Sequence, residues 1–346
     1  MEVFKLIFEK EYVYDDVAEW RLTDAAGNVD WMTVIKKEEP LVNLEELSLW
    51  DIGEEASTDD IIAIFAHCPN SKKLSIEIFS EDYDHDAIGE FIGKECSKIQ
   101  TLNCGSIEIG VDVDGPLLLL ILEALPAQQL EVMIFRGSLS PFCASSFTRP
   151  IQRHSTALHT IHISHTATLE KISVAIIFEE CISLQDFSLE FDRDHGRGLF
   201  ATLSDILERP WNTSNLVSLS LGIGGCELPV EYEGQQPYYD RSAPITLSKA
   251  ETVHFTRLEE LYRRIGSLVE LEFLGLEMMT LDTEGRVDMA LMNKRKSFPA
   301  MLTLGDPKTG RPGYLSLLTD LKKLRYLRRL VHADSTESTA TVGLEE

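Results

Sequence analysis

Residues 44–49 read Leu-Glu-Glu-Leu-Ser-Leu (LEELSL). Leu47 and Leu49 are separated by one polar residue, and side chains two positions apart point to the same face of a β-strand. Leu44 adds an apolar position three residues before Leu47. The stretch therefore predicts a short strand with one face buried in a core and the other face polar.

The same L-x-x-L-x-L pattern returns along the chain at a nearly constant interval. Successive copies of its middle apolar position are 27, 28, 31, 28, 26 and 32 residues apart. Two more copies follow, each after about two intervals. A period of this length is typical of leucine-rich repeats, in which each unit supplies a strand and a helical segment. The nine middle positions are Leu47, Leu74, Leu102, Met133, Ile161, Phe187, Leu219, Leu274 and Leu327.

Between the strands, the apolar spacing becomes helical. Ser57-x-x-Asp60 is a capping pattern that begins a helix, and further helices are expected over 116–126, 168–181, 198–210 and 255–268. One strand and one helix cannot bury their apolar faces alone, so stacked copies share a core. We therefore predict an α/β fold, a leucine-rich-repeat solenoid with a curved parallel β-sheet on the concave side and helices on the convex side.

The repeat also predicts how the chain is divided. Residues 1–40 are expected to form an N-terminal capping segment, 41–332 the repeat domain and 333–346 a disordered tail. The two long intervals indicate insertions near 222–250 and 282–312, which are rich in Gly, Pro, Tyr and charged residues.

The charge of the chain limits its partners. The net charge is -25, which would repel a nucleic-acid backbone or an anionic membrane. The longest apolar run, 117–122, is too short to span a bilayer, and the charged N-terminus does not resemble a secretion signal. We expect a cytoplasmic or nuclear protein. One basic cluster, interpreted as a solvated helix face, comprises Arg311, Lys322, Lys323, Arg325, Arg328 and Arg329.

Six cysteines form no C-x-x-C pair, and without an export signal a disulfide framework is not expected. Cys68, Cys96 and Cys181 each stand three residues before the first position of a repeat motif, which is Ser71, Ile99 or Leu184. We predict that these three side chains pack in the core.

Several local patterns resemble metal-binding or phosphate-binding motifs but lack the residues or the geometry that those motifs need. His159, His162 and His165 are three apart, but on a strand such residues face opposite sides, so no metal site is predicted. The stretch from Asp82 begins like a calcium loop but lacks the required glycine and final acid. The glycines of 305–310 have P-loop spacing without the lysine that follows. We expect no cofactor and no enzymatic activity.

In a leucine-rich-repeat sheet, the residues between and just after the paired leucines line the concave face. Aromatic residues and arginine are frequent anchors of interfaces, which favours Trp50 and Arg136. Acidic residues on the same face favour a basic partner protein. The predicted binding residues are Trp50, Glu77, Arg136, His162, Glu190 and Glu277.

The cysteine-led C-x-x-L-x-x-L-x-L units resemble the repeats of F-box/leucine-rich-repeat proteins, especially those of fungi. The stretch Leu302–Arg328 is similar to the C-terminal repeat of such proteins, and the resemblance covers about residues 40–330. It implies an F-box, a helical module that docks on the Skp1-type adaptor of a ubiquitin ligase. Residues 1–40 have no recognisable F-box and look strand-like.

Two functions therefore stay open. The first is a non-catalytic protein–protein interaction module that binds its partner on the concave surface. The second is the substrate-recognition subunit of an SCF-type ubiquitin ligase. A third, an enzyme within the 222–250 insertion, has only the length of that segment in its favour.

Overall fold

The computed structural model describes residues 4–11, 19–24, 27–30, 40–49, 57–77, 83–105, 115–136, 148–164, 174–192, 197–198, 201–224, 249–279, 313–330 and 342–343. The chain divides into two compact units, Met1–Glu170 and Lys171–Glu346.

Unit 1 contains a parallel sheet built from the predicted strands. Its first parallel pair joins an N-terminal strand, β1, to the LEELSL strand, β4. An antiparallel β1–β2–β3 arrangement extends the sheet beyond β1, with β2 at Glu19–Asp24 and β3 at Gly27–Asp30. The parallel strands, in spatial order, are β1 (Phe4–Glu11), β4 (Leu44–Leu49), β5 (Lys73–Glu77), β6 (Thr101–Gly105), β7 (Val132–Arg136) and β8 (Thr160–Ser164).

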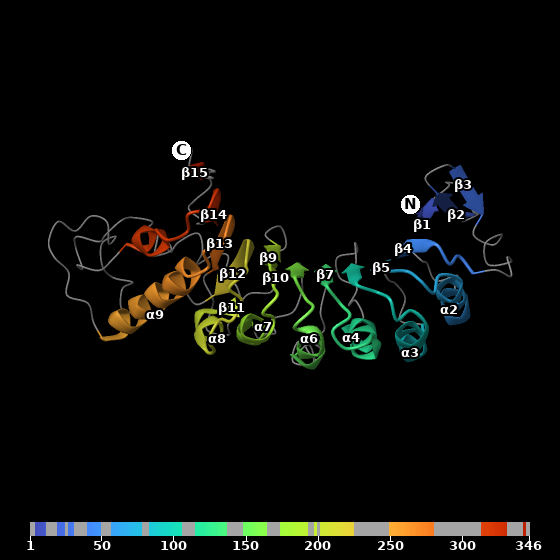
Figure 1. Ribbon diagram of the computed structural model, residues 1–346, viewed down its shortest axis with the longest axis horizontal. Coiled ribbons are helices and arrows are strands. Elements are labelled where there is room, and N and C mark those ends of the chain that lie inside the picture. Colours follow the sequence, from blue (N-terminus) through green and yellow to red (C-terminus); the bar gives the residue numbers. More distant parts are fainter. Residues whose placement is uncertain are drawn as a thin grey trace. The chain divides into compact units, whose positions relative to one another are not determined.

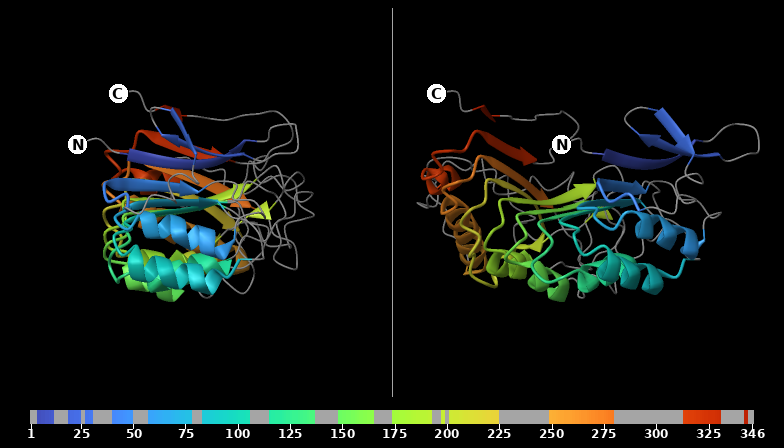
Figure 2. Two further views of the ribbon diagram at one scale, coloured as in Figure 1. Left: turned by 90° about the vertical axis from the view of Figure 1, so that its right-hand side faces the viewer. Right: turned by 45° about the vertical axis from the view of Figure 1, so that its right-hand side comes forward.

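The helices of unit 1 lie on one face of this sheet (Figure 1). The capping pattern found in the sequence begins α2, because the Ser57 side chain accepts from the Asp60 amide and the Asp60 carboxylate accepts from the Ser57 amide. Figure 2 shows the same layering from two further directions. These helices are α2 (Thr58–His67), α3 (His85–Glu95), α4 (Gly115–Ala124) and α6 (Thr148–His154).

Helix α3 occupies the stretch that begins like a calcium loop. Asp84 is its N-cap and accepts a hydrogen bond from the Ala87 amide at 3.0 Å. Gly89 and Gly93 then allow α3 to approach α4 closely. A Cβ on Gly93 would lie 2.1 Å from the Cβ of Ala124. Asp84 thus caps helix α3, and Gly93 permits its close packing against α4.

Unit 2 has the same arrangement of parallel strands with helices on one face. Its four main parallel strands lie further apart in the sequence. They are β9 (Asp186–Asp192), β12 (Ser218–Gly224), β13 (Phe273–Met279) and β14 (Tyr326–Leu330). Short strands β10 (Arg197–Gly198), β11 (Ala201–Thr202) and β15 (Val342–Gly343) pair with β9, β12 and β14. Helices α7 (Val174–Glu180), α8 (Leu203–Leu207) and α9 (Lys249–Gly266) cover one face, with the 3-10 helix η4 (Tyr314–Leu318) against α9 (Figure 1).

Two expectations for unit 2 need correction. The predicted helix over 198–210 is confined to α8, because Ala201 and Thr202 pair with β12 and a capping box of Thr202 with Asp205 begins the helix only there. The basic cluster is not a helix face: Lys322 and Lys323 lie in a turn, and Arg328 and Arg329 lie in β14. Most of both insertions, 225–248 and 280–312, lies outside the described residues, as does the tail apart from β15.

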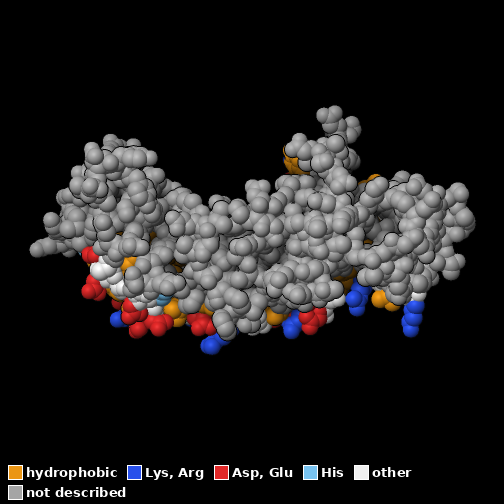
Figure 3. Space-filling view, turned by 180° about the vertical axis from the view of Figure 1, so that it is seen from behind, with side chains coloured by type: hydrophobic (Ala, Val, Ile, Leu, Met, Phe, Trp, Pro, Cys, Tyr) orange, Lys and Arg blue, Asp and Glu red, His pale blue; other side chains and the backbone are white. Residues whose placement is uncertain are grey.

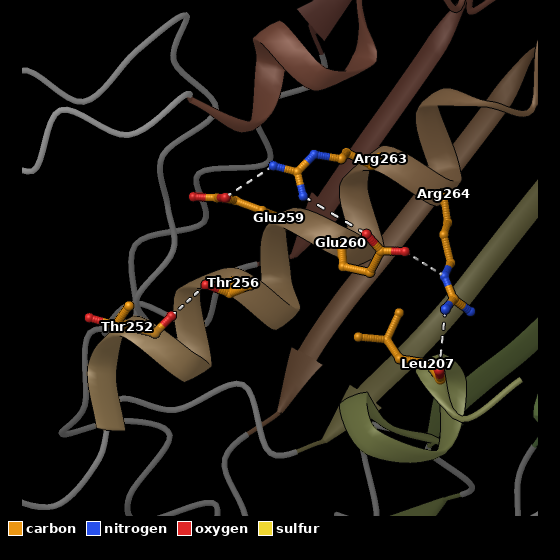
Figure 4. Close-up of polar contacts among 7 residues, drawn as sticks. All are labelled: Leu207, Thr252, Thr256, Glu259, Glu260, Arg263 and Arg264. Carbon is orange, nitrogen blue, oxygen red and sulfur yellow. Dashed lines mark hydrogen bonds and ion pairs between the residues drawn. The ribbon is translucent and has the colours of Figure 1, made fainter. Parts of the chain in front are cut away.

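A consecutive pair of arginines on α9 shows how the helices of unit 2 are held together (Figure 4). Arg264 donates to the carbonyl oxygens of Leu207 and Arg209, at 3.3 and 2.5 Å, where α8 ends. On their own helix, Arg263 pairs with Glu259 and Glu260, and Arg264 pairs with Glu260. Arg264 therefore satisfies carbonyl groups that the end of α8 leaves without an intrahelical partner.

The middle apolar residues of the repeats form two continuous buried rows. In unit 1 the strand registers align Leu47, Leu74, Leu102, Met133 and Ile161, and in unit 2 they align Phe187, Leu219, Leu274 and Leu327. The predicted packing of Cys68, Cys96 and Cys181 is also confirmed, since all three are buried. The α/β leucine-rich-repeat fold class predicted from the sequence is thereby confirmed.

Candidate functional site

The sheet face that points away from the helices is the candidate site, and we refer to it as the helix-distal face. In β5 and β6, buried apolar residues alternate with half-buried polar ones, so the polar residues occupy this face. In unit 1 the registers align one such row across five strands. The row consists of Ser48, Ser75, Asn103, Ile134 and His162.

This row has small polar residues at one end and larger ones at the other. Asn103 donates from Nδ2 to Ser75 Oγ at 3.4 Å, which links two adjacent strands. Ser48 is only 1% exposed, whereas Ser75, Asn103, Ile134 and His162 are half-buried. A partner would therefore meet the middle strands of unit 1 and not Ser48.

The strand registers give the backbone positions of most of the predicted binding residues. Glu77, Gly105 and Arg136 are consecutive Cα partners on β5, β6 and β7, and His162 lies one strand further, in the adjacent row. In unit 2, Glu277 is paired with Gly222 and Glu190 lies within β9. Trp50 and the side chains of Glu77, Arg136, Glu190 and Glu277 lie outside the described residues.

Unit 2 presents two aromatic residues that the sequence reasoning missed. Phe273 and Tyr326 begin β13 and β14 and are Cα partners, and Tyr326 is 58% exposed. Each stands directly before the middle leucine of its repeat, so strand alternation places it on the helix-distal face. Applying the same alternation to the residue just before each middle leucine would have found both.

The floor beside these rings is made of small residues. A Cβ on Gly275 would lie 3.2 Å from Cε1 of Phe273 and 3.1 Å from Oγ of Ser220. The Phe273 ring therefore lies along the strand toward Gly275. Ser188, Ser220 and Gly275 are aligned on β9, β12 and β13, and Gly275 is buried beneath the Phe273 ring.

Polar and charged side chains pair at the turns that lead into the strands. In unit 1, Lys72 contacts Glu45 at 3.0 Å, and Glu131 accepts from Gln100 at 2.9 Å. In unit 2, Arg325 lies 3.5 Å from Glu272. A second pair there joins Lys323 to Glu270. Each pair joins consecutive repeats.

The helix surface of unit 1 is acidic. Acidic side chains gather on part of the helix side in Figure 3. The exposed acidic residues of the unit 1 helices are Asp59, Asp86, Glu90, Glu95 and Glu123. We interpret this acidic helix surface as solvated.

The four described cysteines and one buried histidine are held in unreactive states. Burial raises the pKa of the Cys68, Cys96, Cys104 and Cys181 thiols to about 12, so these sulfurs stay protonated at neutral pH. His154 is buried and engaged with two backbone groups. Within the part of the chain that the structure describes, no three His, Cys, Asp or Glu side chains are grouped as metal ligands would be.

The described helices include none with the length and apolarity needed to cross a bilayer. Comparison with models of known protein families gives no match for this chain, and comparison with curated proteins gives none either. The assignment of the site therefore depends on its own geometry.

Proposed function

We propose that this chain is a protein–protein interaction module that binds its partner on the helix-distal face and carries out no chemistry of its own. The observation that supports this most directly is the continuous, in-register row from Ser75 to His162. Half-buried residues on rigid strands form a surface whose geometry exists before binding, which lowers the entropy cost of association.

The chemical character of the face supports protein binding over catalysis. Its described residues combine small polar groups, an aliphatic side chain and an imidazole, without a grouped set of ligands or activated nucleophiles. A partner segment crossing the strands could use the small residues for close approach and Ile134 for apolar contact. The basic partner predicted from Glu77, Glu190 and Glu277 is part of this proposal, as is the choice of Trp50 and Arg136 as anchors.

The test is affinity purification of the full chain from cells, with a bulky charge placed on either face. Asn103→Arg adds an arginine to the middle of the row, and Ala66→Arg adds the same group to an exposed position on α2. We expect Asn103→Arg to lose the partners recovered with the wild type and Ala66→Arg to retain them. Equal recovery with both variants would overturn the proposal, provided that both give the circular dichroism of the wild type.

The ubiquitin-ligase role remains a prediction from the resemblance. Where the structure describes residues 4–30, it shows three strands and none of the helices of an F-box. No described feature favours this role over simple partner binding. Pull-down with a Skp1-type adaptor tests it separately.

A further inference from the structure

Hydrogen bonds on the helix side of unit 1 join the segment before β7 to the segment before β8, and His154 lies among them. We refer to the contacts between residues 122–131 and 153–160 as the His154 junction. We propose that protonation of His154 opens this junction while the strands stay paired, which gives unit 1 an acid-sensitive conformational device between two repeats. The device is a property of the fold and does not depend on the proposed function.

The His154 ring makes two contacts that both require its neutral form. The ring is fully buried, with Nε2 2.9 Å from the Leu122 carbonyl oxygen and Nδ1 3.3 Å from the Leu130 amide nitrogen. A carbonyl oxygen only accepts and an amide only donates, so the ring has its proton on Nε2. A second proton on Nδ1 would meet the Leu130 N–H, and two donors would then face each other away from water.

The charged groups around the ring do not favour a second proton on it. Burial lowers the pKa of His154, the hydrogen bond to the carbonyl of α4 opposes this change, and the positive charge of Arg153 lowers the pKa further. On α4, the Glu123 side chain is exposed. Before β7, the Glu131 carboxylate lies 3.7 Å from His159, and a proton on His159 would strengthen that pair. Acid therefore acts against the junction through His154.

The turn before β7 is held in a strained backbone conformation by the same junction. Gln128 has a φ of 61°, a left-handed conformation that is unfavourable for a residue with a Cβ. Its side-chain oxygen accepts from the Thr156 amide at 3.0 Å, and its own amide donates to the Arg153 carbonyl oxygen at 3.1 Å. Gln128 and Thr156 are exposed, so water can replace their bond. Opening the junction therefore releases the strain of this turn.

The strands on either side of the junction do not depend on the His154 ring. β7 and β8 are paired over the whole length of both strands, and the ring contacts backbone groups that lie outside them. Met133 and Ile161, which are adjacent in the buried row, are 1% and 0% exposed. Helix α6 has only seven residues, too few to be stable without its contacts. It is therefore α6, and not the sheet, that separates when the ring becomes charged.

Another junction of unit 1 provides a comparison within the same molecule. Cys96 Sγ donates to the Phe65 carbonyl oxygen in the last turn of α2, at 3.9 Å. Burial raises the pKa of Cys96 to about 12, so this thiol stays protonated and uncharged between pH 8 and pH 5. We refer to the contacts between residues 65–72 and 96–100 as the Cys96 junction. Acid should leave it closed.

Hydrogen exchange of the full chain, followed by mass spectrometry of its peptides at pH 7.5 and 5.0, tests the device. An unstructured peptide corrects for the intrinsic effect of pH on amide exchange. Each pH unit below the ordinary pKa of 6.5 raises the opening constant by up to about tenfold. We therefore expect the protection of residues 122–131 and 151–158 to fall by about tenfold or more at pH 5.0. The Cys96 junction and the strands β7 and β8 should keep their protection.

Two variants assign the effect to the ring. In His154→Gln the side-chain amide offers one donor and one acceptor but does not titrate, so the protection of residues 122–131 should persist at pH 5.0. Gln152→Ala, at an exposed position on α6, is the matched control and should behave as the wild type.

Three results would overturn the inference. The first is an equal loss of protection at the His154 and Cys96 junctions of the wild type, and the second is an equal loss in β7 and β8, since unit 1 would then unfold as a whole. The third is the same loss in His154→Gln as in the wild type. The first two comparisons lie within the wild type, so they decide the question even where a variant does not fold. None of these results bears on Asn103→Arg, so the device and the proposed function fail separately.

Discussion

His154, at the end of α6, is joined to Leu122 of α4 in the preceding repeat: its Nε2 lies 2.9 Å from the Leu122 carbonyl oxygen. On the other side of the ring, Nδ1 accepts from the Leu130 amide at 3.3 Å. A neutral ring with its proton on Nε2 satisfies both contacts, whereas a second proton on Nδ1 would remove the acceptor. The neutral imidazole therefore holds two repeats together inside the core.

This geometry predicts a pH dependence of stability. Burial lowers the pKa of His154 from its ordinary value of 6.5, against the opposing effect of the bond to Leu122. Since the folded state binds fewer protons than the unfolded state, the contribution is complete above about pH 6.5 and is lost as the pH falls through the folded pKa. Urea unfolding of wild type and His154→Gln at pH 7.5 and 5.0 should show a larger loss for the wild type.

The measured quantity is the difference between the two proteins, because the many carboxylates of the chain also respond to pH. Identical changes in the unfolding free energy of wild type and His154→Gln would contradict the assignment. Gln152→Ala, at an exposed position on the same helix, provides a control and should retain the pH dependence of the wild type.

Close packing of α3 against α4 predicts that alanine is harmful at Gly93. In an exposed helix interior, a change from glycine to alanine stabilises by about 1 kcal/mol. At Gly93 the added Cβ would lie 2.1 Å from the Cβ and 2.9 Å from the backbone of Ala124. We expect Gly93→Ala to lower the unfolding free energy by about 1–3 kcal/mol, measured by urea denaturation. Glu90→Ala, at an exposed position on the same helix, should be nearly neutral.

The two adjacent arginines of α9 should differ in their effect on stability. Arg264→Gln removes donors from the carbonyl groups of Leu207 and Arg209, and we expect a loss of about 1–3 kcal/mol because those groups are left unsatisfied. Arg263→Gln affects pairs within one helix, with half-exposed Glu260 and with Glu259, whose side chain is 6% exposed. Because glutamine can still donate to Glu259, the loss should be smaller than that of Arg264→Gln. Thermal unfolding of both variants compares them, and equal shifts would show that α8 does not depend on Arg264.

The buried thiols should resist alkylation in the folded protein. With pKa values raised to about 12 by burial, Cys68, Cys96, Cys104 and Cys181 have almost no thiolate at pH 8. Iodoacetamide followed by peptide mapping should label these four only after denaturation. Labelling of any of them in the native state at the rate of a free thiol would place that residue outside the core.

Local patterns predicted most of the sheet, because strand direction and side-chain alternation are properties of short segments. All nine L-x-x-L-x-L copies are strands, and Ser57 begins a helix as its spacing with Asp60 predicts. Helix α6 was missed because Pro150 lies inside it, although proline is tolerated in a first turn. Helix α3 was missed because its aspartates suggested a calcium loop, and only the neighbouring backbone shows Asp84 acting as a cap.

By itself the sequence determined which residues of each repeat face the core, since a period of two assigns each side chain to a face whatever the neighbours are. It also determined that the repeats must stack, because no single strand and helix can cover its own apolar surface. Only the tertiary structure decided which residues meet across repeats: His154 with Leu122, Gly93 with Ala124, and Phe273 with Tyr326. Those contacts depend on register and approach between segments far apart in the chain, and the pattern within one repeat contains neither.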